Sequence, residues 1–326
     1  MKEIKEYIQP GMEQVNAIIV SALRSDIPLL DSTNRNLREH PGKMLRPTLA
    51  LLVAGAICPA GLPDDTYRYA AAAELLHNAT LLHDDVVDGA TERRGMPTVA
   101  SLLSGSAAVL IGDYWLAKCL QVILGARRET DRVLRLYAQT ISHLTEGELL
   151  QMQKAQSADT LQSDYLRIIY GKTASLFEST ALTAAISVGA DETVTRAMGD
   201  FAYQLGLAFQ IKDDIFDYED VSADIGKPVG IDLMEQKITQ PLLCALESVD
   251  AGEQARIRDM VRNILDHPEY VEGIRAFVKA QDGIEKAARV MDDYVNKAIS
   301  CLDILPESKE KLYLARLARY VGQRDK

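Results

Sequence analysis

Apolar residues along this chain recur mainly at spacings of three and four residues. Two such series are Ile111, Trp115, Cys119 and Val122, and Phe177, Ala181, Ala184 and Val188. Residues three and four apart lie on one face of an α-helix, whereas a half-buried strand alternates at a spacing of two. Few stretches alternate in that way. The pattern therefore predicts an all-α protein.

Glycine and proline divide the helical pattern into segments that correspond to about a dozen helices. The chain has only 20 Gly and 11 Pro, and the helix-breaking positions cluster. They fall at Pro41-Gly42, Gly61 to Pro63, Gly95 to Pro97, Gly226 to Gly230 and His267-Pro268. There is no Ser/Gly/Pro-rich linker, low-complexity tract or repeat of fixed period. We therefore expect residues 1–326 to form one helical domain.

The amino-acid composition and net charge argue against several classes of protein. The hydrophobic share of 47% and charged share of 25% argue against a disordered or membrane-resident chain. With 36 Lys and Arg against 47 Asp and Glu, the net charge of -11 opposes non-specific binding to nucleic acid. The four cysteines form no CxxC pair, so neither a zinc site nor a disulfide scaffold is indicated.

The sequence indicates neither export nor membrane insertion. The N-terminal stretch MKEIKEYIQPGMEQ carries charges of both signs and lacks the apolar segment of a signal peptide. The most apolar segment, from Ala107 to Leu124, is interrupted by Asp113 and Lys118. It falls short of the roughly 20 apolar residues that a membrane-spanning helix needs. We therefore expect no transmembrane segment and a cytoplasmic protein.

Two copies of an aspartate pattern lie within apolar helical stretches. The sequences ELLHNATLLHDDVVD and AFQIKDDIFDY each contain Asp-Asp-x-x-Asp. The residues are Asp84, Asp85, Asp88, Asp213, Asp214 and Asp217. At about 3.6 residues per turn, the first and last aspartates of each copy project from nearly the same helical face. Such carboxylates repel one another by roughly 4 kcal/mol per pair at 4 Å and intermediate dielectric, so a cation must lie between them.

The chemistry of these side chains favours magnesium. Carboxylate oxygens are hard ligands, and one or two per ion, completed by water and phosphate oxygens, suit Mg²⁺ better than a dedicated Ca²⁺ cage. The sequence therefore predicts a Mg²⁺-bound diphosphate as ligand. A single copy of the pattern could equally be a solvated helix end, but two copies in apolar helices weaken that interpretation.

Basic residues cluster beside these motifs, although the protein as a whole is acidic. They are Lys43, Arg46, Arg93, Arg94, Lys172, Lys212, Lys227 and Lys237. An isolated lysine is usually an ordinary surface cation. Recurrence beside loops and helix starts instead indicates a focused anion pocket. We expect two anionic groups, one held through metal and one by side chains alone.

In these stretches the chain resembles the trans-isoprenyl diphosphate synthase family, also called polyprenyl synthetases. The resemblance is carried by GKMLRP, ELLHNATLLHDDVVDGATERRGMPT, GDYWLAK, IIYGKTASLF, AFQIKDDIFDY and GKPVGIDLMEQKITQP. It implies the all-α isoprenoid synthase fold with a central apolar cavity, a homodimer, and condensation of isopentenyl diphosphate with an allylic diphosphate. It also implies about three Mg²⁺ ions per active site while the allylic substrate is bound.

The resemblance also assigns roles to individual residues. The six aspartates would hold Mg²⁺ that bridges to the allylic diphosphate. The same diphosphate would contact Arg93, Lys172, Lys227 and Lys237. The catalytic set would be Lys172, Thr173, Gln210 and Lys227, with Thr173 and Gln210 near the reacting carbon. The metal-free isopentenyl diphosphate site would comprise Lys43, Arg46, His77 and Arg94, helped by Arg324 and Lys326.

This set of residues supports an ionisation mechanism. Metal and cationic side chains stabilise charge on the leaving diphosphate more than they stabilise the intact ester. The C–O bond would break heterolytically, and the double bond of isopentenyl diphosphate would attack the allylic cation. The departed diphosphate can then take the final proton, so no protein nucleophile is required.

The residues upstream of Asp84 bear on product length. Ala79 lies about 7.5 Å up the helix axis, with Thr80 beside it and Leu76 nearly one turn further. In the family that this chain resembles, an aromatic residue there and two extra residues in the first motif go with short products; this chain has neither. We therefore expect a product longer than fifteen carbons, octaprenyl-like, of the kind used for quinone side chains. Candidates for the tunnel floor are Trp115, Leu116, Cys119 and Leu120.

Other functions fit the sequence less well. A geranylgeranyl diphosphate synthase is the nearest alternative. A terpene cyclase would carry an Asn/Ser/Glu-type second motif, and a non-catalytic partner subunit would tolerate loss of one aspartate motif. A di-iron bundle needs two Glu-x-x-His motifs, and only Glu74 to His77 fits. His83, Tyr114 and Trp115 are expected to pack in helix interfaces.

Overall fold

The computed structural model is helical almost throughout. It describes residues 1–39, 42–93, 95–219 and 230–324. Within these ranges it contains sixteen α-helices, two short helices of other types and one two-stranded hairpin, so the predicted all-α class is confirmed. The chain divides into two compact units. Unit 1 is Met1–Tyr137, Ser179–Met198 and Ile304–Leu314, and unit 2 is Ala138–Glu178, Gly199–Asp303 and Ala315–Lys326.

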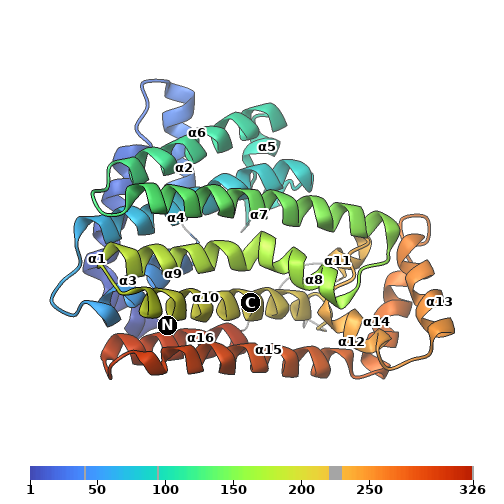
Figure 1. Cartoon of the computed structure of the whole chain (residues 1–326). Helices are drawn as coiled ribbons and strands as arrows, with labels where there is room; N and C mark the ends of the chain where they lie inside the picture. The colour runs from blue at the N-terminus through green and yellow to red at the C-terminus, as the bar shows by residue number, and fades with distance from the viewer. Residues whose placement is uncertain (40–41, 94, 220–229, 325–326) are drawn as a thin grey trace. The chain divides into compact units, whose positions relative to one another are not determined.

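Unit 1 contains the first aspartate motif. Its first helices are α1 (Lys2–Ala22), α2 (Pro28–Glu39), α3 (Leu45–Ile57) and α4 (Asp64–Val87). The strands β1 (Glu92–Arg93) and β2 (Met96–Pro97) then pair antiparallel, with Arg93 opposite Met96. They are followed by α5 (Val99–Leu102) and α6 (Gly105–Leu124). Within this unit α4 and α6 run side by side (Figure 1).

The core of unit 1 depends on two helices that are apolar on more than one face. Leu49, Leu52 and Val53 of α3 are fully buried, and so are Ala70 to Ala73 of α4. Small side chains on α4 let its neighbours approach closely, because the distance between packed helices depends on the side chains at the contact. This packing fixes α4, which carries the first motif at its C-terminal end.

Local sequence signals set the starts and ends of several helices. Thr98 and Ser104 precede α5 and α6, and their side-chain oxygens accept the backbone N–H groups of Ser101 and Ala107, each at 3.1 Å. Such N-caps typically stabilise a helix by about 1 kcal/mol. The breaks predicted at Gly61 to Pro63, Gly95 to Pro97 and His267-Pro268 lie between helices. Pro41 and residues 226–229 lie outside the described residues.

Unit 2 contains the second aspartate motif, on α10. Four helices pass from one unit into the other along the chain: α7 (Thr130–Ser157), α9 (Ser175–Ser187), α10 (Glu192–Phe216) and α16 (Lys309–Gln323). The other helices are α8 (Gln162–Ile169), α11 (Ile231–Met234), α12 (Gln240–Leu246), α13 (Ala251–Arg262), α14 (Tyr270–Ala280) and α15 (Gly283–Cys301), followed by the 3₁₀ turn η2 (Leu302–Ile304).

Between α8 and α9 the chain forms a π-helical turn, η1 (Tyr170–Ala174), which contains Lys172 and Thr173. Within unit 2 this turn passes close to α7 at two glycines. A Cβ on Gly171 would lie 2.6 Å from the His143 carbonyl oxygen and 2.8 Å from Gly147 Cα. Because both are backbone atoms, only glycine permits this approach. Single π turns are rare and frequently occur at functional sites.

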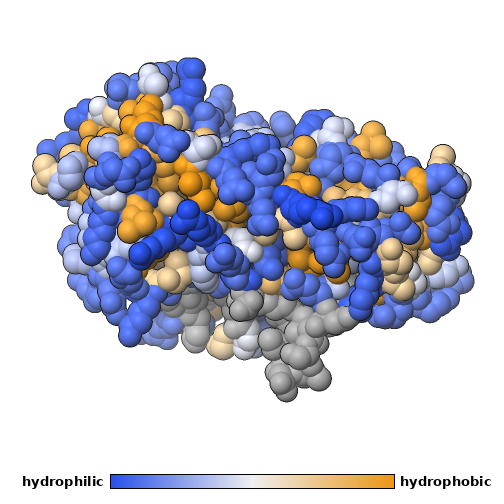
Figure 2. Space-filling model, turned by 90° about the horizontal axis from the view of Figure 1, so that it is seen from below, coloured by the Kyte–Doolittle hydropathy of each residue, from blue (hydrophilic) through white to orange (hydrophobic). Residues whose placement is uncertain are grey.

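One helix in the described part of the chain, α6, is long and apolar enough to cross a membrane by length and composition. A core helix of a water-soluble protein passes the same test, and 39% of the apolar window of α6 is buried. The helix is therefore weak evidence for a membrane span. Figure 2 shows hydrophilic residues over most of the face seen from below, with apolar residues in separate groups.

Candidate active site

The first aspartate motif lies at the C-terminal end of α4. Asp84 is half-buried, Asp85 is buried and Asp88 is exposed. The helix ends at Val87, and the Asp88 N–H still donates to the Asp84 carbonyl oxygen at 2.8 Å. Asp84 and Asp88 therefore lie one helical turn apart, as their spacing predicts.

Arg93 connects the hairpin to this motif. Its Nε lies 2.5 Å from Asp85 Oδ1, and the side chain of Asp85 is only 6% exposed. Both residues line a cavity of about 80 Å³ beside α2. Within the described ranges the carboxylate of Asp88 has no such partner. The structure thus brings Arg93 to the first motif, while Arg94 lies outside the described residues.

Three of the residues expected to bind isopentenyl diphosphate belong to unit 1, whereas Arg324, expected to help them, belongs to unit 2 and contacts Asp213. Lys43 is exposed and Arg46 is buried near the start of α3, and His77 is half-buried on α4. Lys43 lines a cavity of about 460 Å³ together with residues of α1. Lys5, Glu6 and Glu13 of α1 line the same cavity, so side chains of both charges border it.

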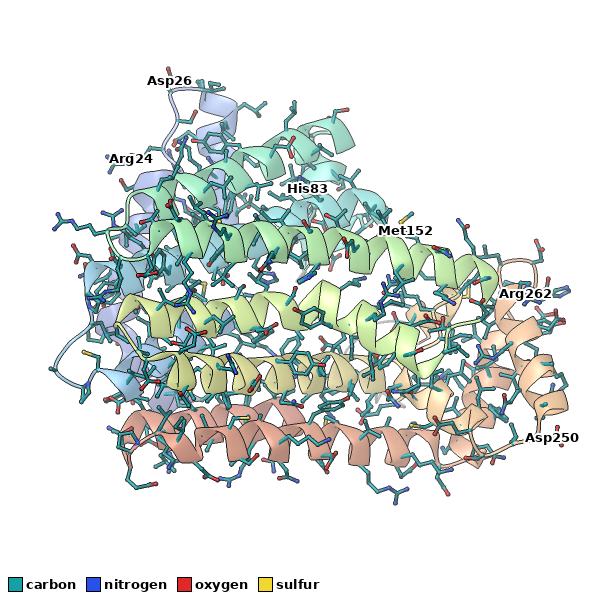
Figure 3. All side chains as sticks on the ribbon, in the orientation of Figure 1. Arg24, Asp26, His83, Met152, Asp250 and Arg262 are labelled. Carbon is teal, nitrogen blue, oxygen red and sulfur yellow. The ribbon has the colours of Figure 1, made fainter. Side chains whose placement is uncertain are left out.

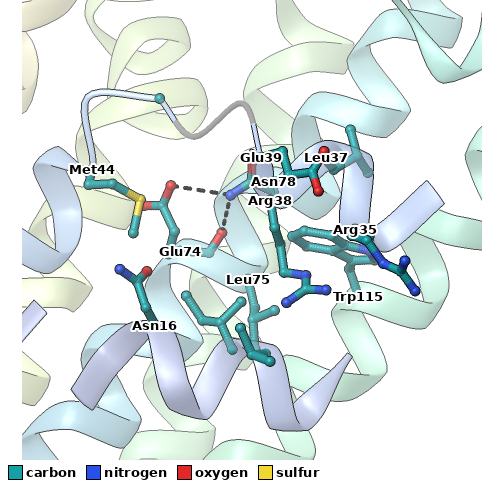
Figure 4. Close-up of a pocket in the computed structure, with 13 residues that line it drawn as sticks. Asn16, Arg35, Leu37, Arg38, Glu39, Met44, Glu74, Leu75, Asn78 and Trp115 are labelled. Carbon is teal, nitrogen blue, oxygen red and sulfur yellow. Dashed lines mark hydrogen bonds between the residues drawn. The ribbon is translucent and has the colours of Figure 1, made fainter. Parts of the chain in front are cut away.

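A second large cavity of unit 1, about 360 Å³ in volume, is lined by Gly42 and Met44, the neighbours of Lys43 in the sequence. Asn78 donates to the Glu74 carbonyl oxygen at 2.8 Å and to Glu74 Oε1 at 3.2 Å (Figure 4). Trp115 Nε1 donates to Asn34 Oδ1 at 2.8 Å and Trp115 is buried. Trp115 therefore packs between α6 and α2, as expected for a residue in a helix interface.

His83, labelled in Figure 3, precedes the first motif on α4. Its Nε2 lies 3.3 Å from Asp113 Oδ1 and 3.3 Å from the Val109 carbonyl oxygen, both on α6. A Cβ at position 112 would lie 2.3 Å from His83 Nε2, so Gly112 makes room for the ring. The expectation that His83 packs in a helix interface is confirmed.

The residues expected to affect product length lie on α4. Leu76 and Ala79 are each 1% exposed, and the Thr80 hydroxyl donates to the His77 carbonyl oxygen at 2.8 Å. Cys119 of α6 is buried against the Leu76 backbone, and burial raises the pKa of its thiol. The side chain at position 79 is thus small and faces the interior.

In the second motif, the first and last aspartates each have protein partners within unit 2. Asp213 Oδ1 lies 2.5 Å from Arg324 Nη2, which also donates to the Phe209 carbonyl oxygen at 3.0 Å. The Asp217 carboxylate accepts the backbone N–H groups of Gly230, Ile231 and Asp232 at 3.0 to 3.1 Å. Burial raises the pKa of Asp217, and these N–H groups oppose that shift. Asp217 therefore anchors the start of α11.

The middle aspartate of this motif, Asp214, is only 3% exposed. Its Oδ2 accepts the Tyr165 hydroxyl at 2.6 Å, and its Oδ1 accepts Gln210 Nε2 at 3.0 Å. Burial, followed by the charge of Asp232, raises the pKa of Asp214 to about 8, and these hydrogen bonds oppose the rise. A cation bound nearby would favour the ionised carboxylate. Burial also raises the pKa of Tyr165 well above its usual value, so its hydroxyl remains a donor at neutral pH.

Several of the expected site residues of unit 2 line one cavity of about 150 Å³. They are Lys172, Gln210, Asp214 and Lys237. The Thr173 hydroxyl donates to Gln210 Oε1 at 2.7 Å and so joins this group. Lys172 Nζ lies 2.8 Å from Glu148 Oε2 and 3.1 Å from Gln151 Oε1. Lys227 lies outside the described residues.

Five polar residues that line this cavity were not expected from the sequence: Gln151, Thr160, Tyr165, Asp232 and Thr239. Tyr165 stands seven residues before Lys172, a spacing that repeats on one helical face, so it could have been suspected. Asp232 stands five residues before Lys237 within GKPVGIDLMEQKITQP, so it could have been suspected as well. Gln151 carries no comparable signal, because it reaches the cavity from a segment that is distant in the sequence.

The donor set of the two motifs fits magnesium. Every side chain offers carboxylate oxygens, which suit a hard cation. Within the described part of the chain, no group of three or more His, Cys, Asp or Glu side chains is placed to hold a metal ion. Water and phosphate oxygens would complete the coordination, which is how proteins usually bind Mg²⁺.

Known proteins are similar to this chain over nearly its full length. The family model for polyprenyl synthetase matches residues 27–278. Octaprenyl diphosphate synthase of Haemophilus influenzae is 34% identical and covers 97% of this chain and 94% of that protein. Octaprenyl diphosphate synthase of Escherichia coli is also 34% identical, over 100% of this chain and 99% of that protein. The crystal structure of a decaprenyl diphosphate synthase from Rhodobacter capsulatus has a TM-score of 0.91 at 34% identity, covering 100% and 99% of the two chains.

Proposed function

This chain belongs to the polyprenyl synthetase family and is a prenyltransferase, and from that premise we propose that it condenses isopentenyl diphosphate head to tail onto an allylic diphosphate. The product is an all-trans polyprenyl diphosphate longer than fifteen carbons. The relatives that make octaprenyl and decaprenyl diphosphates support this length, as does the small Ala79 upstream of the first motif. The observation that carries the proposal is the cavity of unit 2, where Lys172, Gln210 and Asp214 meet.

The aspartates of each motif are the residues that would hold Mg²⁺ for the allylic diphosphate. About three Mg²⁺ ions, when bound, would supply positive charge that favours ionisation of the diphosphate ester. Arg93, Lys172, Lys227 and Lys237 add positive charge to the same group. Glu148 and Gln151 hold the Lys172 ammonium in place by contacts of 2.8 and 3.1 Å, so little reorganisation is needed on binding.

The Thr173 and Gln210 side chains orient the allylic carbon. The Thr173 hydroxyl donates to Gln210 Oε1, so its oxygen lone pairs remain available to face a developing cation. Ile168, Ile169 and Ile238 line the same cavity and exclude water that would quench the cation. These residues bind and shield the substrate, and no protein nucleophile takes part.

The second substrate, isopentenyl diphosphate, binds to Lys43, Arg46, His77 and Arg94 without metal. The exposed Lys43 beside a cavity of about 460 Å³ supports this assignment. Positive side chains alone suit a diphosphate that must keep its C–O bond intact, because a bound metal would promote ionisation of that bond as well.

The chain acts as a cytoplasmic homodimer, and residues 1–326 form one functional domain. Val109, Leu110 and Leu124 of α6 are 38%, 68% and 61% exposed, which is typical of a protein interface. Light scattering of the purified protein would detect the dimer, and a monomer at micromolar concentration would contradict it.

A product assay tests the function directly. Purified protein is incubated with isopentenyl diphosphate, an allylic primer and Mg²⁺, and the products are dephosphorylated and separated by chromatography. We expect alcohols longer than fifteen carbons that form only when Mg²⁺ is present. A twenty-carbon product as the sole species would favour a geranylgeranyl diphosphate synthase, and no product with any primer would contradict the proposal.

A further inference from the structure

One buried tyrosine of unit 2 has no role in the function proposed above. Tyr165 lies on α8, is 2% exposed, and donates its hydroxyl to Asp214 Oδ2 at 2.6 Å. Gln210 Nε2 holds the other oxygen, Oδ1, at 3.0 Å. With one donor on each oxygen, the Asp214 carboxylate cannot rotate freely. Each oxygen still has a lone pair for a cation or a water molecule.

The same contacts fix the direction of a longer hydrogen-bond chain. The Tyr165 hydroxyl and the Gln210 amide nitrogen both donate to Asp214, so Gln210 turns its NH₂ group toward that residue. Its carbonyl oxygen then faces Thr173, whose hydroxyl donates to it at 2.7 Å. The orientation of both Gln210 and Thr173 therefore depends on the position of the Asp214 carboxylate.

We propose that Tyr165 is a positioning residue for the second aspartate motif, which holds the Asp214 carboxylate in the orientation that metal and diphosphate binding require. Through Asp214 it also orients Gln210 and Thr173. The inference rests on the proposed function and deepens it. Partners that orient the ligands of a metal site commonly change metal affinity or activity by about 10- to 100-fold when they are removed.

The decisive variant is Tyr165→Phe, which removes one oxygen atom and keeps the buried ring. A matched control is Tyr313→Phe. Tyr313 is also fully buried, and its hydroxyl also donates to a carboxylate, Glu3 Oε1, at 2.8 Å. Tyr313 belongs to α16 in unit 1, and Glu3 belongs to neither motif. The control therefore reports what the loss of a buried phenol oxygen does in general.

The measurement is binding of Mn²⁺ in the presence of inorganic diphosphate, followed by the electron paramagnetic resonance signal of free Mn²⁺. We expect Tyr165→Phe to bind Mn²⁺ at least about tenfold more weakly than the wild type, whereas Tyr313→Phe binds it normally. Steady-state kinetics should show a similar fall in kcat with an unchanged KM for isopentenyl diphosphate. Thermal unfolding of the two variants should be shifted alike.

A double-variant cycle tests whether Tyr165 acts through Asp214. If it does, adding Tyr165→Phe to Asp214→Asn weakens Mn²⁺ binding little beyond Asp214→Asn alone. Normal Mn²⁺ binding by Tyr165→Phe, an equal loss in Tyr313→Phe, or additive losses in the cycle would each overturn the inference. A wild-type protein that makes no prenyl product would instead overturn the proposed function, so the two failures are distinguishable.

Discussion

The two aspartate motifs have the same sequence pattern but lie in different environments. The first ends a helix, with Asp88 exposed and Asp85 paired to Arg93. In the second, Asp214 is buried between Tyr165 and Gln210, and Asp217 accepts three backbone N–H groups. The second motif is thus part of the packing of unit 2, whereas the first has one exposed member, Asp88, at its helix end.

Because the two motifs differ in burial and in hydrogen-bond partners, the effect of a substitution on catalysis can be separated from its effect on folding stability. A carboxylate that is exposed and unpaired contributes little to folding, whereas a buried one with several donors leaves those donors unsatisfied when it is removed. We therefore expect substitutions in both motifs to abolish catalysis, and we expect removal of the buried Asp214 to weaken the fold more than removal of the exposed Asp88.

The largest expected effect is on turnover. Asp84→Ala and Asp213→Ala should each lower kcat by about 10²-fold or more, because each removes a carboxylate that we propose as a metal ligand for the leaving diphosphate. Product formation at saturating substrate and Mg²⁺ measures this loss. Asp64→Ala, an exposed acid at the other end of α4, is the control and should leave turnover unchanged. Near-normal activity of either motif variant would contradict the metal assignment.

The second-largest expected effect is on product length. It concerns only α4, the helix that carries the first motif. Ala79→Tyr places an aromatic side chain about 7.5 Å along α4 from Asp84 and should shift the products to shorter alcohols. Ala79→Ser adds one atom and should keep the long product. Both are measured by chromatography of the dephosphorylated products. Unchanged product length in a folded Ala79→Tyr protein would show that α4 does not line the tunnel at this position.

Sequence reasoning succeeded where the determining property is local. The period of apolar residues and the position of glycine and proline predicted the all-α class and the breaks around α4 and α14, because helix formation depends on nearby residues. The aspartate motifs were found for the same reason. The π turn at Tyr170–Ala174 was not predicted, since it arises from the close glycine contact between α7 and η1 and not from a propensity of YGKTA.

The partners of the site residues could not be predicted, because they depend on which helix faces meet. Lys172 is held by Glu148 and Gln151 from α7, and Asp214 by Tyr165 from α8. No pattern within either segment encodes these pairings. The difference in burial between the two motifs could not be predicted for the same reason. The roles given to Arg94 and Lys227 stay predictions, since both lie outside the described residues.

A smaller effect is expected on the free energy of unfolding, and it should differ between the two motifs. Asp214→Ala leaves the Tyr165 hydroxyl and the Gln210 NH₂ group without their acceptor, and an unsatisfied buried donor costs about 1–3 kcal/mol. We therefore expect the free energy of unfolding to fall by about that amount, measured by urea denaturation without metal. A change below about 0.5 kcal/mol would place this carboxylate outside the packing of unit 2.

The smallest effect is expected for Asp88→Ala, which should change the free energy of unfolding by no more than about 0.5 kcal/mol in the same urea experiment. Asp88 is exposed at the C-cap of α4, where the partial negative charge of the helix end makes an acidic side chain slightly unfavourable. The substitution should therefore be neutral or weakly stabilising while turnover falls. Such an outcome would indicate that Asp88 serves the chemistry and not the stability of the fold. Destabilisation of more than about 1 kcal/mol would mean that the first motif also supports the fold, and the contrast between the motifs would no longer hold.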